Sequence, residues 1–198
     1  MASHDRLAAQ LREVFGDRLK MVAAFGADAH TCAIVESVTT EDLDRCARLF
    51  GGSAGWKSAG LGAPLLISSD ELKRALDAFP LEFSEIIATR RLIAGDDLLT
   101  TLSVPAEDLR RACEVQARSH LVHLREGYIE AGGDRKAVAA LVAASKSPFQ
   151  ALVSNIARLD QTTSDDLIKR LGLIADGFPD ALHAAERLVE YVDRWAKR

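Results

Sequence analysis

The β-strand pattern of this sequence stops at Pro105, and that break constrains the fold more than any other feature. Before it, apolar runs typical of strands, at 19–25, 31–35 and 64–67, alternate with short amphipathic helices. After it, apolar residues recur at helical spacing. We therefore predict an α+β fold with two domains, a mixed β-sheet flanked by helices over 1–103 and an antiparallel helical bundle over 104–198.

Capping signals predict where the helices begin. Ser68, with Glu71 three residues later, forms a capping box that predicts a helix ending near Ala78. The other predicted capping residues are Thr39 or Thr40, Asp134, Thr163 or Ser164, and Asp180.

Segment 79–86 and residue Pro148 give two further predictions about the secondary structure. Segment 79–86 alternates apolar and polar residues, which predicts a half-buried strand that carries Glu82 and Glu85. Pro148 is expected to kink or split the second helix of the bundle, because proline removes a helical hydrogen bond.

The composition excludes several classes of protein. With 48% apolar and 27% charged residues, the chain has enough apolar side chains for a core, which excludes global disorder. A net charge of −4 argues against general nucleic-acid binding. The sequence lacks a long uninterrupted apolar run, a signal-peptide pattern and a pairing pattern among its three cysteines. We therefore expect a cytoplasmic protein with no membrane partner.

The segment 51–58, Gly-Gly-Ser-Ala-Gly-Trp-Lys-Ser, is close to the phosphate-binding loop G-x-x-x-x-G-K-[ST]. Trp56 stands where that loop needs a glycine, and a large side chain there would keep the backbone amides from closing around phosphate. The segment is instead predicted to be a helix end followed by a glycine-rich loop.

Arg118 and His123 lie five residues apart in the first predicted helix of the bundle. The spacing is similar to the R-x4-6-H motif of HEPN-type ribonucleases, in which Arg and His act on an RNA phosphodiester. That similarity implies an RNA-directed protein or a toxin–antitoxin component. The ordinary interpretation is a solvated helix face.

Several segments, taken in order, resemble nucleotidyltransferase-fold proteins. The resemblance is to a bacterial subgroup in which a nucleotidyltransferase-like domain precedes a helical tail. It covers about residues 10–160 and is carried by segments 15–26, 56–66, 79–86, 91–97 and 109–128. The family implies a strand that ends in an apolar-Gly-Ser turn, which holds a nucleotide phosphate, and a following strand with an Asp-x-Asp pair that binds metal.

This sequence departs from the family at those positions. The turn is Phe25-Gly26-Ala27, without the serine hydroxyl, and the two aspartate positions fall near Thr31 and Ala33. Glu82 could stand in for a third carboxylate. Nucleotidyl transfer depends on metal to neutralise the triphosphate. We therefore expect a nucleotidyltransferase-like protein that has lost catalysis, uses no metal or cofactor, and acts as a binding or regulatory module.

Two alternatives stay open at this stage. One is an active nucleotidyltransferase that uses Mg²⁺ and ATP, with Asp28, Glu36 and Glu82 as unusual metal ligands, and that acts on a small molecule, a protein or an RNA end. The other is the HEPN-like function of Arg118 and His123.

Family geometry also predicts a ligand pocket between the sheet and the bundle, because the helix after Pro105 is expected to pack across the sheet. The candidate lining residues are Gly26, Glu82, Glu85, Arg125 and Tyr128. The expected partner is an unidentified small molecule or protein. The Ala/Val-rich stretch 137–144 is more apolar than one core face requires, which favours a homodimer.

Overall fold

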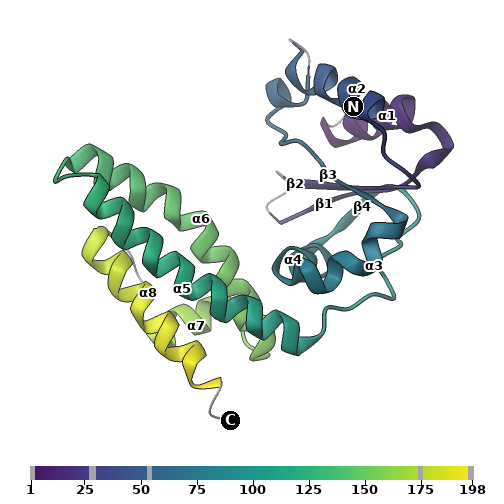
Figure 1. Ribbon diagram of the computed structural model, residues 1–198. Helices are drawn as coiled ribbons and strands as arrows, with labels where there is room; N and C mark the ends of the chain where they lie inside the picture. The colour runs from purple at the N-terminus through teal and green to yellow at the C-terminus, as the bar shows by residue number, and fades with distance from the viewer. Residues whose placement is uncertain (1–2, 27–29, 53–54, 174–175, 196–198) are drawn as a thin grey trace. The chain divides into compact units, whose positions relative to one another are not determined.

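A computed structural model describes residues 3–26, 30–52, 55–173 and 176–195. The chain divides into two compact units, Met1–Val104 and Pro105–Arg198, which we call the sheet unit and the helical unit. The chain is α+β: a four-stranded mixed sheet with helices, followed by a helical region (Figure 1).

The sheet has the strand order β3-β2-β1-β4. Its strands are β1 (Leu19–Phe25), β2 (His30–Val35), β3 (Leu65–Ser68) and β4 (Arg91–Gly95). β1 is antiparallel to β2 and β4, whereas β2 is parallel to β3. The three predicted strands are confirmed. β4, a short edge strand with exposed ends, was not predicted.

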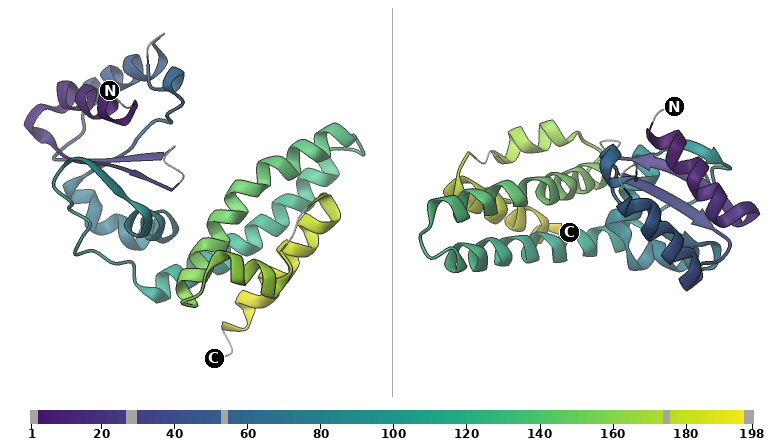
Figure 2. Two further views of the ribbon diagram at one scale, coloured as in Figure 1. Left: turned by 180° about the vertical axis from the view of Figure 1, so that it is seen from behind. Right: turned by 90° about the horizontal axis from the view of Figure 1, so that it is seen from above.

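Helices cover both faces of this sheet (Figures 1 and 2). On one face lie α1 (Ser3–Phe15) and α2 (Thr40–Gly51), and on the other lie α3 (Ser69–Ala78) and α4 (Pro80–Thr89). Short 3-10 turns, η1 (Gly16–Arg18) and η2 (Lys57–Ala59), lead into β1 and toward β3. The sheet is therefore the middle of three layers, and its two central strands, β1 and β2, are largely buried.

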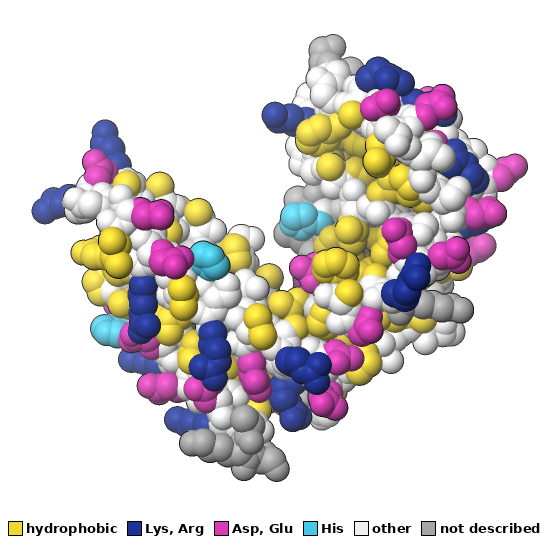
Figure 3. Space-filling model, viewed as in Figure 1, with side chains coloured by type: hydrophobic (Ala, Val, Ile, Leu, Met, Phe, Trp, Pro, Cys, Tyr) yellow, Lys and Arg dark blue, Asp and Glu magenta, His cyan; other side chains and the backbone are white. Residues whose placement is uncertain are grey.

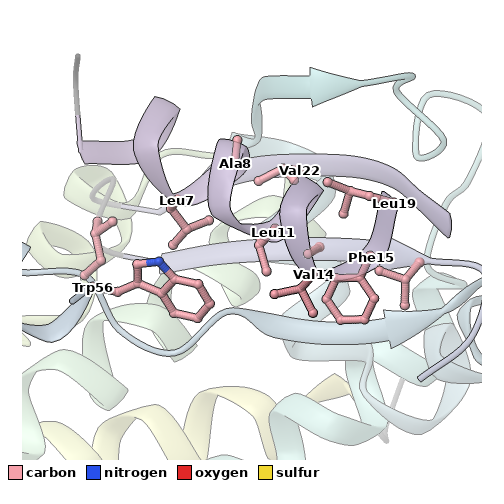
Figure 4. Packing of buried hydrophobic residues seen from close by; sticks show 11 residues of the cluster. Leu7, Ala8, Leu11, Val14, Phe15, Leu19, Val22 and Trp56 are labelled. Carbon is pink, nitrogen blue, oxygen red and sulfur yellow. The ribbon is translucent and has the colours of Figure 1, made fainter. Parts of the chain in front are cut away.

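The core between α1 and the sheet follows from helical spacing. Leu7, Leu11 and Val14 recur on one face of α1, where they pack with Val22 of β1 and with Trp56 (Figure 4). Successive β1 residues point to opposite faces, so a second core forms beneath α3 and α4.

Segment 79–86 is not a strand, and this prediction was wrong. Pro80 occupies the first turn of α4, where its missing N–H costs nothing. Phe83 and Ile86, one helical turn apart, are both buried against the sheet. Glu82 and Glu85 therefore lie on a helix. The prediction failed because the pattern that alternates with period two also satisfies helical spacing.

The two capping boxes in the sheet unit form as reciprocal pairs. Thr39 accepts from the Asp42 amide and Asp42 accepts from the Thr39 amide. Ser68 and Glu71 do the same at the start of α3. These two helix starts are confirmed. They could be predicted because the hydrogen bonds that define them are local in the sequence.

The helical unit consists of α5 (Ala106–Glu130), α6 (Arg135–Leu159), α7 (Ser164–Leu171) and α8 (Phe178–Asp193). Asp134 and Thr163 cap α6 and α7 as predicted, and α8 begins two residues before Asp180 because Pro179 fits its first turn. Pro148 lies inside a continuous α6, so the helix is not split.

α5 packs against both α6 and α8. Gly127 allows α5 and α6 to approach closely, because a Cβ there would lie 2.7 Å from Leu141 Cδ1. Among the helices of the described residues, α6 is the one that is long and apolar enough to cross a membrane, and core helices of other proteins pass the same length and composition test.

Candidate functional site

The turn after β1 is the place where the resemblance puts a phosphate. Gly26 has a φ of +63°, and its N–H donates to Thr89 Oγ1 at 2.9 Å. The Thr89 hydroxyl in turn donates to the backbone oxygen of Glu85 at 2.8 Å. The amide that would hold a phosphate is therefore already bonded to α4.

His30 and Glu85 flank this glycine. A Cβ built on Gly26 would lie 3.7 Å from His30 Cδ2 and 3.8 Å from Glu85 Oε1, which is ordinary contact. The His30 ring stacks on Phe25, with their centroids 5.5 Å apart. The structure thus brings together two predicted residues, Gly26 and Glu85, beside an imidazole that the sequence did not single out.

The two positions predicted for metal-binding aspartates are buried. Thr31 is 2% exposed and Ala33 is 0% exposed. Ala33 packs in the core that α1 closes, and Thr31 Oγ1 has no hydrogen-bond partner among the described residues. These positions are part of the hydrophobic interior and present no oxygen to a hydrated Mg²⁺.

Glu36 and Glu82, two of the three carboxylates considered as unusual ligands, have different surroundings. Glu36 Oε2 pairs with Lys20 Nζ at 3.1 Å. Glu82, in the first turn of α4, lines a groove of about 520 Å³ beside β3, with Phe79 at its rim. Asp28 lies outside the described residues. Over the described part of the chain, no group of three His, Cys, Asp or Glu side chains could hold a metal ion.

Two described backbone amides of the glycine-rich segment after α2 are hydrogen-bonded to backbone carbonyls. α2 ends at Gly51, and residues 53–54 lie outside the description. The N–H of Gly55 donates to the Gly52 carbonyl at 2.8 Å, and the N–H of Trp56 donates to the Leu49 carbonyl at 3.2 Å. Trp56 itself is 3% exposed. This is a helix end followed by a loop, as predicted.

Arg118 and His123 are both on α5 but turn away from each other. Five residues on an α-helix correspond to a rotation of about 140° beyond one full turn. Arg118 Nη2 pairs with Asp193 Oδ1 at 2.6 Å, and His123 Nδ1 lies 2.8 Å from the backbone oxygen of Ser119. The structure does not bring the two side chains to one reacting group.

No buried cysteine is prepared as a nucleophile. Cys32 and Cys113 are free and buried, and burial raises the pKa of each thiol to about 12. Burial likewise raises the pKa of Cys46. Because the thiolate is the reactive form, these raised pKa values disfavour a nucleophilic role for the thiols at neutral pH.

Arg125 and Tyr128 lie on α5, whereas Gly26, Glu82 and Glu85 belong to the sheet unit. Arg125 Nη2 pairs with Glu186 Oε1 at 3.0 Å. The predicted cleft that would unite the five residues stays a prediction.

Tyr128 also lines a pocket of about 570 Å³ within the helical unit, which we call the helical pocket. It is formed by α6, by Asp176 and Gly177, and by the first turn of α8, where Phe178 stacks on Tyr128 with centroids 4.1 Å apart. The sequence signal was a pair of cations on one face of α6, Arg135 and Lys146, with only Val and Ala between them on that face. From the sequence alone, the apolar part of this face predicts a dimer surface.

Comparisons with protein-family models, curated proteins and solved structures found no match for this chain. The resemblance to nucleotidyltransferases therefore stays a hypothesis.

Proposed function

We propose that the chain is a binding or regulatory module of the nucleotidyltransferase-like class that carries out no metal-dependent transfer. The observation that carries the proposal is the burial of Thr31 and Ala33, where the class would place its metal ligands. A carboxylate at either position would enter the interior of the sheet unit, where an unpaired charge is strongly disfavoured.

The occupied amide of Gly26 supports the same proposal. Its bond to Thr89 removes a donor that the family turn would offer to a nucleotide phosphate. Glu36 supports it as well, because its pairing with Lys20 leaves its charge compensated without a metal. The module would act on a small molecule or a protein partner in the cytoplasm.

A transfer assay tests the proposal. The purified chain is incubated with labelled ATP or GTP, Mg²⁺ and a panel of small-molecule, protein and RNA acceptors, beside an active nucleotidyltransferase as a positive control. We expect no label transfer above the protein-free background. Calorimetric titration with ATP and Mg²⁺ is expected to show no binding that depends on the metal.

Two variants decide how a positive result is interpreted. Transfer that disappears in both Glu36→Gln and Glu82→Gln would overturn the proposal and establish the active alternative with these ligands. Transfer that survives both variants would also overturn it. An Arg118→Gln or His123→Ala variant that abolishes RNA cleavage would establish the HEPN-like alternative instead.

A further inference from the structure

The helical pocket has an apolar floor with a cation at each end. Arg135, Val138, Val142 and Lys146 follow one another at helical spacing, so they lie along one face of α6. The two cations are eleven positions apart in the sequence, which corresponds to about 16 Å along the helix axis. Such a face suits a ligand with an apolar body and a negatively charged group at one end.

Two aromatic rings also line the pocket. Tyr128 of α5 and Phe178 of α8 stack with an interplanar angle of 20°, and Tyr128 remains 46% exposed. Pro179 continues the apolar surface beside them. Aromatic rings that are partly exposed favour offset or edge contact with another flat ring.

The two cations of the helical pocket outnumber the acidic side chains that line it. Neither Arg135 nor Lys146 forms an ion pair or a side-chain hydrogen bond with any residue in the described part of the chain. Among the described residues that line the pocket, Asp176 is the one that is acidic. Elsewhere in the helical unit, Arg118, Arg125 and Arg170 each have a carboxylate partner. On the face drawn in Figure 3, acidic and basic side chains are likewise interspersed.

We propose that the helical pocket binds a small organic anion with a flat apolar body, such as an aryl carboxylate, sulfonate or phosphate. The volume lies within the range of about 300–1,000 Å³ typical of small-molecule sites. The apolar body would lie on Val138 and Val142 against the stacked rings, and the anionic group would meet Lys146 or Arg135. The site stands whether or not the sheet unit transfers nucleotides.

A fluorescent probe pair tests both halves of the proposal on the full chain. Anilinonaphthalene sulfonate carries the anion, and phenylnaphthylamine has the same rings without it. We expect saturable binding of the sulfonate at one site per chain, weakened by salt because exposed charges are screened. Equal affinity for the neutral probe would overturn the assignment to anions, and failure of the sulfonate to bind would overturn the site.

Charge variants test the role of the cation. Lys146→Gln is expected to weaken sulfonate binding about threefold to fivefold, as for a partly exposed ion pair. Lys136→Gln is the matched control, since Lys136 is exposed on the same helix and does not line the pocket. Equal weakening by both variants would show a general effect of net charge and would overturn the site.

Steric variants test the place of binding. Ala139 lines the pocket and Ala140 does not, although both are exposed on α6. Ala139→Phe is expected to reduce the affinity more than tenfold, whereas Ala140→Phe leaves it unchanged. Binding unaltered by Ala139→Phe would locate the probe elsewhere, such as the groove beside β3. Thermal unfolding of each variant verifies the fold, and Lys146→Gln keeps the proposal testable if Ala139→Phe is destabilised.

Discussion

Ion pairs of similar length have different surroundings in the two units. In the sheet unit, Arg18 donates from two nitrogens to Asp42, each at 2.8 Å, and the Asp42 side chain is 5% exposed. In the helical unit, Arg118 pairs with Asp193 at 2.6 Å, but the two side chains are 59% and 40% exposed. Because water screens the second pair, burial rather than distance decides how much each pair stabilises the fold.

Close approaches at glycine differ in the same way. A Cβ on Gly95 would lie 2.0 Å from the backbone oxygen of Lys20, whereas a Cβ on Gly127 would lie 2.7 Å from a methyl group of Leu141. A backbone in a paired strand cannot move aside, but a leucine side chain can change rotamer. At these positions the sheet unit has rigid, buried constraints, whereas the helical unit has adjustable ones.

Gly95→Ala is expected to have the largest effect. Gly95 has a φ of +80°, so alanine would combine backbone strain with a clash against β1 and disrupt the pairing of β1 with β4. We expect a loss of about 4 kcal/mol in the free energy of unfolding. Urea unfolding monitored by Trp56 fluorescence in a Trp195→Phe background measures it.

Gly127→Ala is the contrasting variant in the helical unit. The higher helix propensity of alanine partly offsets the contact with Leu141, so the expected loss is at most about 1 kcal/mol. Gly60→Ala, which has a positive φ but open space around its Cβ, separates strain from clash in the sheet unit. Similar losses for Gly95→Ala and Gly127→Ala would contradict the distinction between the units.

Asp42→Asn is expected to cause the second-largest loss in the free energy of unfolding, and this loss depends on pH. Hydrogen bonds from Arg18, assisted by Thr39, hold the pKa of Asp42 well below its usual range. A carboxyl with a lowered folded-state pKa contributes stability above its unfolded pKa of about 3.9, and the contribution is lost as the pH falls below that value. At pH 7 the variant is expected to lose about 2 kcal/mol, because it leaves Arg18 without its charged partner.

The pH profile supplies the check on that mechanism. Urea midpoints measured between about pH 6 and pH 2.5 should fall less steeply for Asp42→Asn than for the unmodified chain. Asp44→Asn, at an exposed position of the same helix, should follow the unmodified chain. A profile unchanged by Asp42→Asn would rule out Asp42 as a source of the acid sensitivity.

Helix starts could be predicted because their determinants are local. Thr39 and Asp42, or Ser68 and Glu71, complete their hydrogen bonds within four residues of sequence. Segment 79–86 could not be decided in this way, because its letters satisfy two periodicities and packing against the sheet selects one. β4 escaped prediction because its pairing with β1 joins residues far apart in the sequence.

The candidate site residues also differ in whether their surroundings depend on local or on distant parts of the sequence. Gly26 was a local signal, a glycine that ends a strand, and its positive φ agrees with a turn. The sequence predicts Tyr128 in a cleft between the sheet and the helices, which stays a prediction, and gives no sign that its ring stacks on Phe178, fifty residues later on α8. Arg135 and Lys146 line the same pocket as the first turn of α8, and nothing local in the sequence indicates that proximity.

Arg118→Gln is expected to have the smallest effect and completes the comparison. Removing this exposed pair should change the free energy of unfolding by less than about 0.5 kcal/mol, measured by Trp195 fluorescence in a Trp56→Phe background. A double-mutant cycle with Asp193→Asn isolates the pairwise energy from other effects of each change. A coupling energy as large as the loss expected for Asp42→Asn, and insensitive to salt, would mean that the helical unit also relies on its ion pairs. A coupling that vanishes at high salt would show that solvent and salt screen this exposed pair, so that burial rather than distance sets its contribution to the fold.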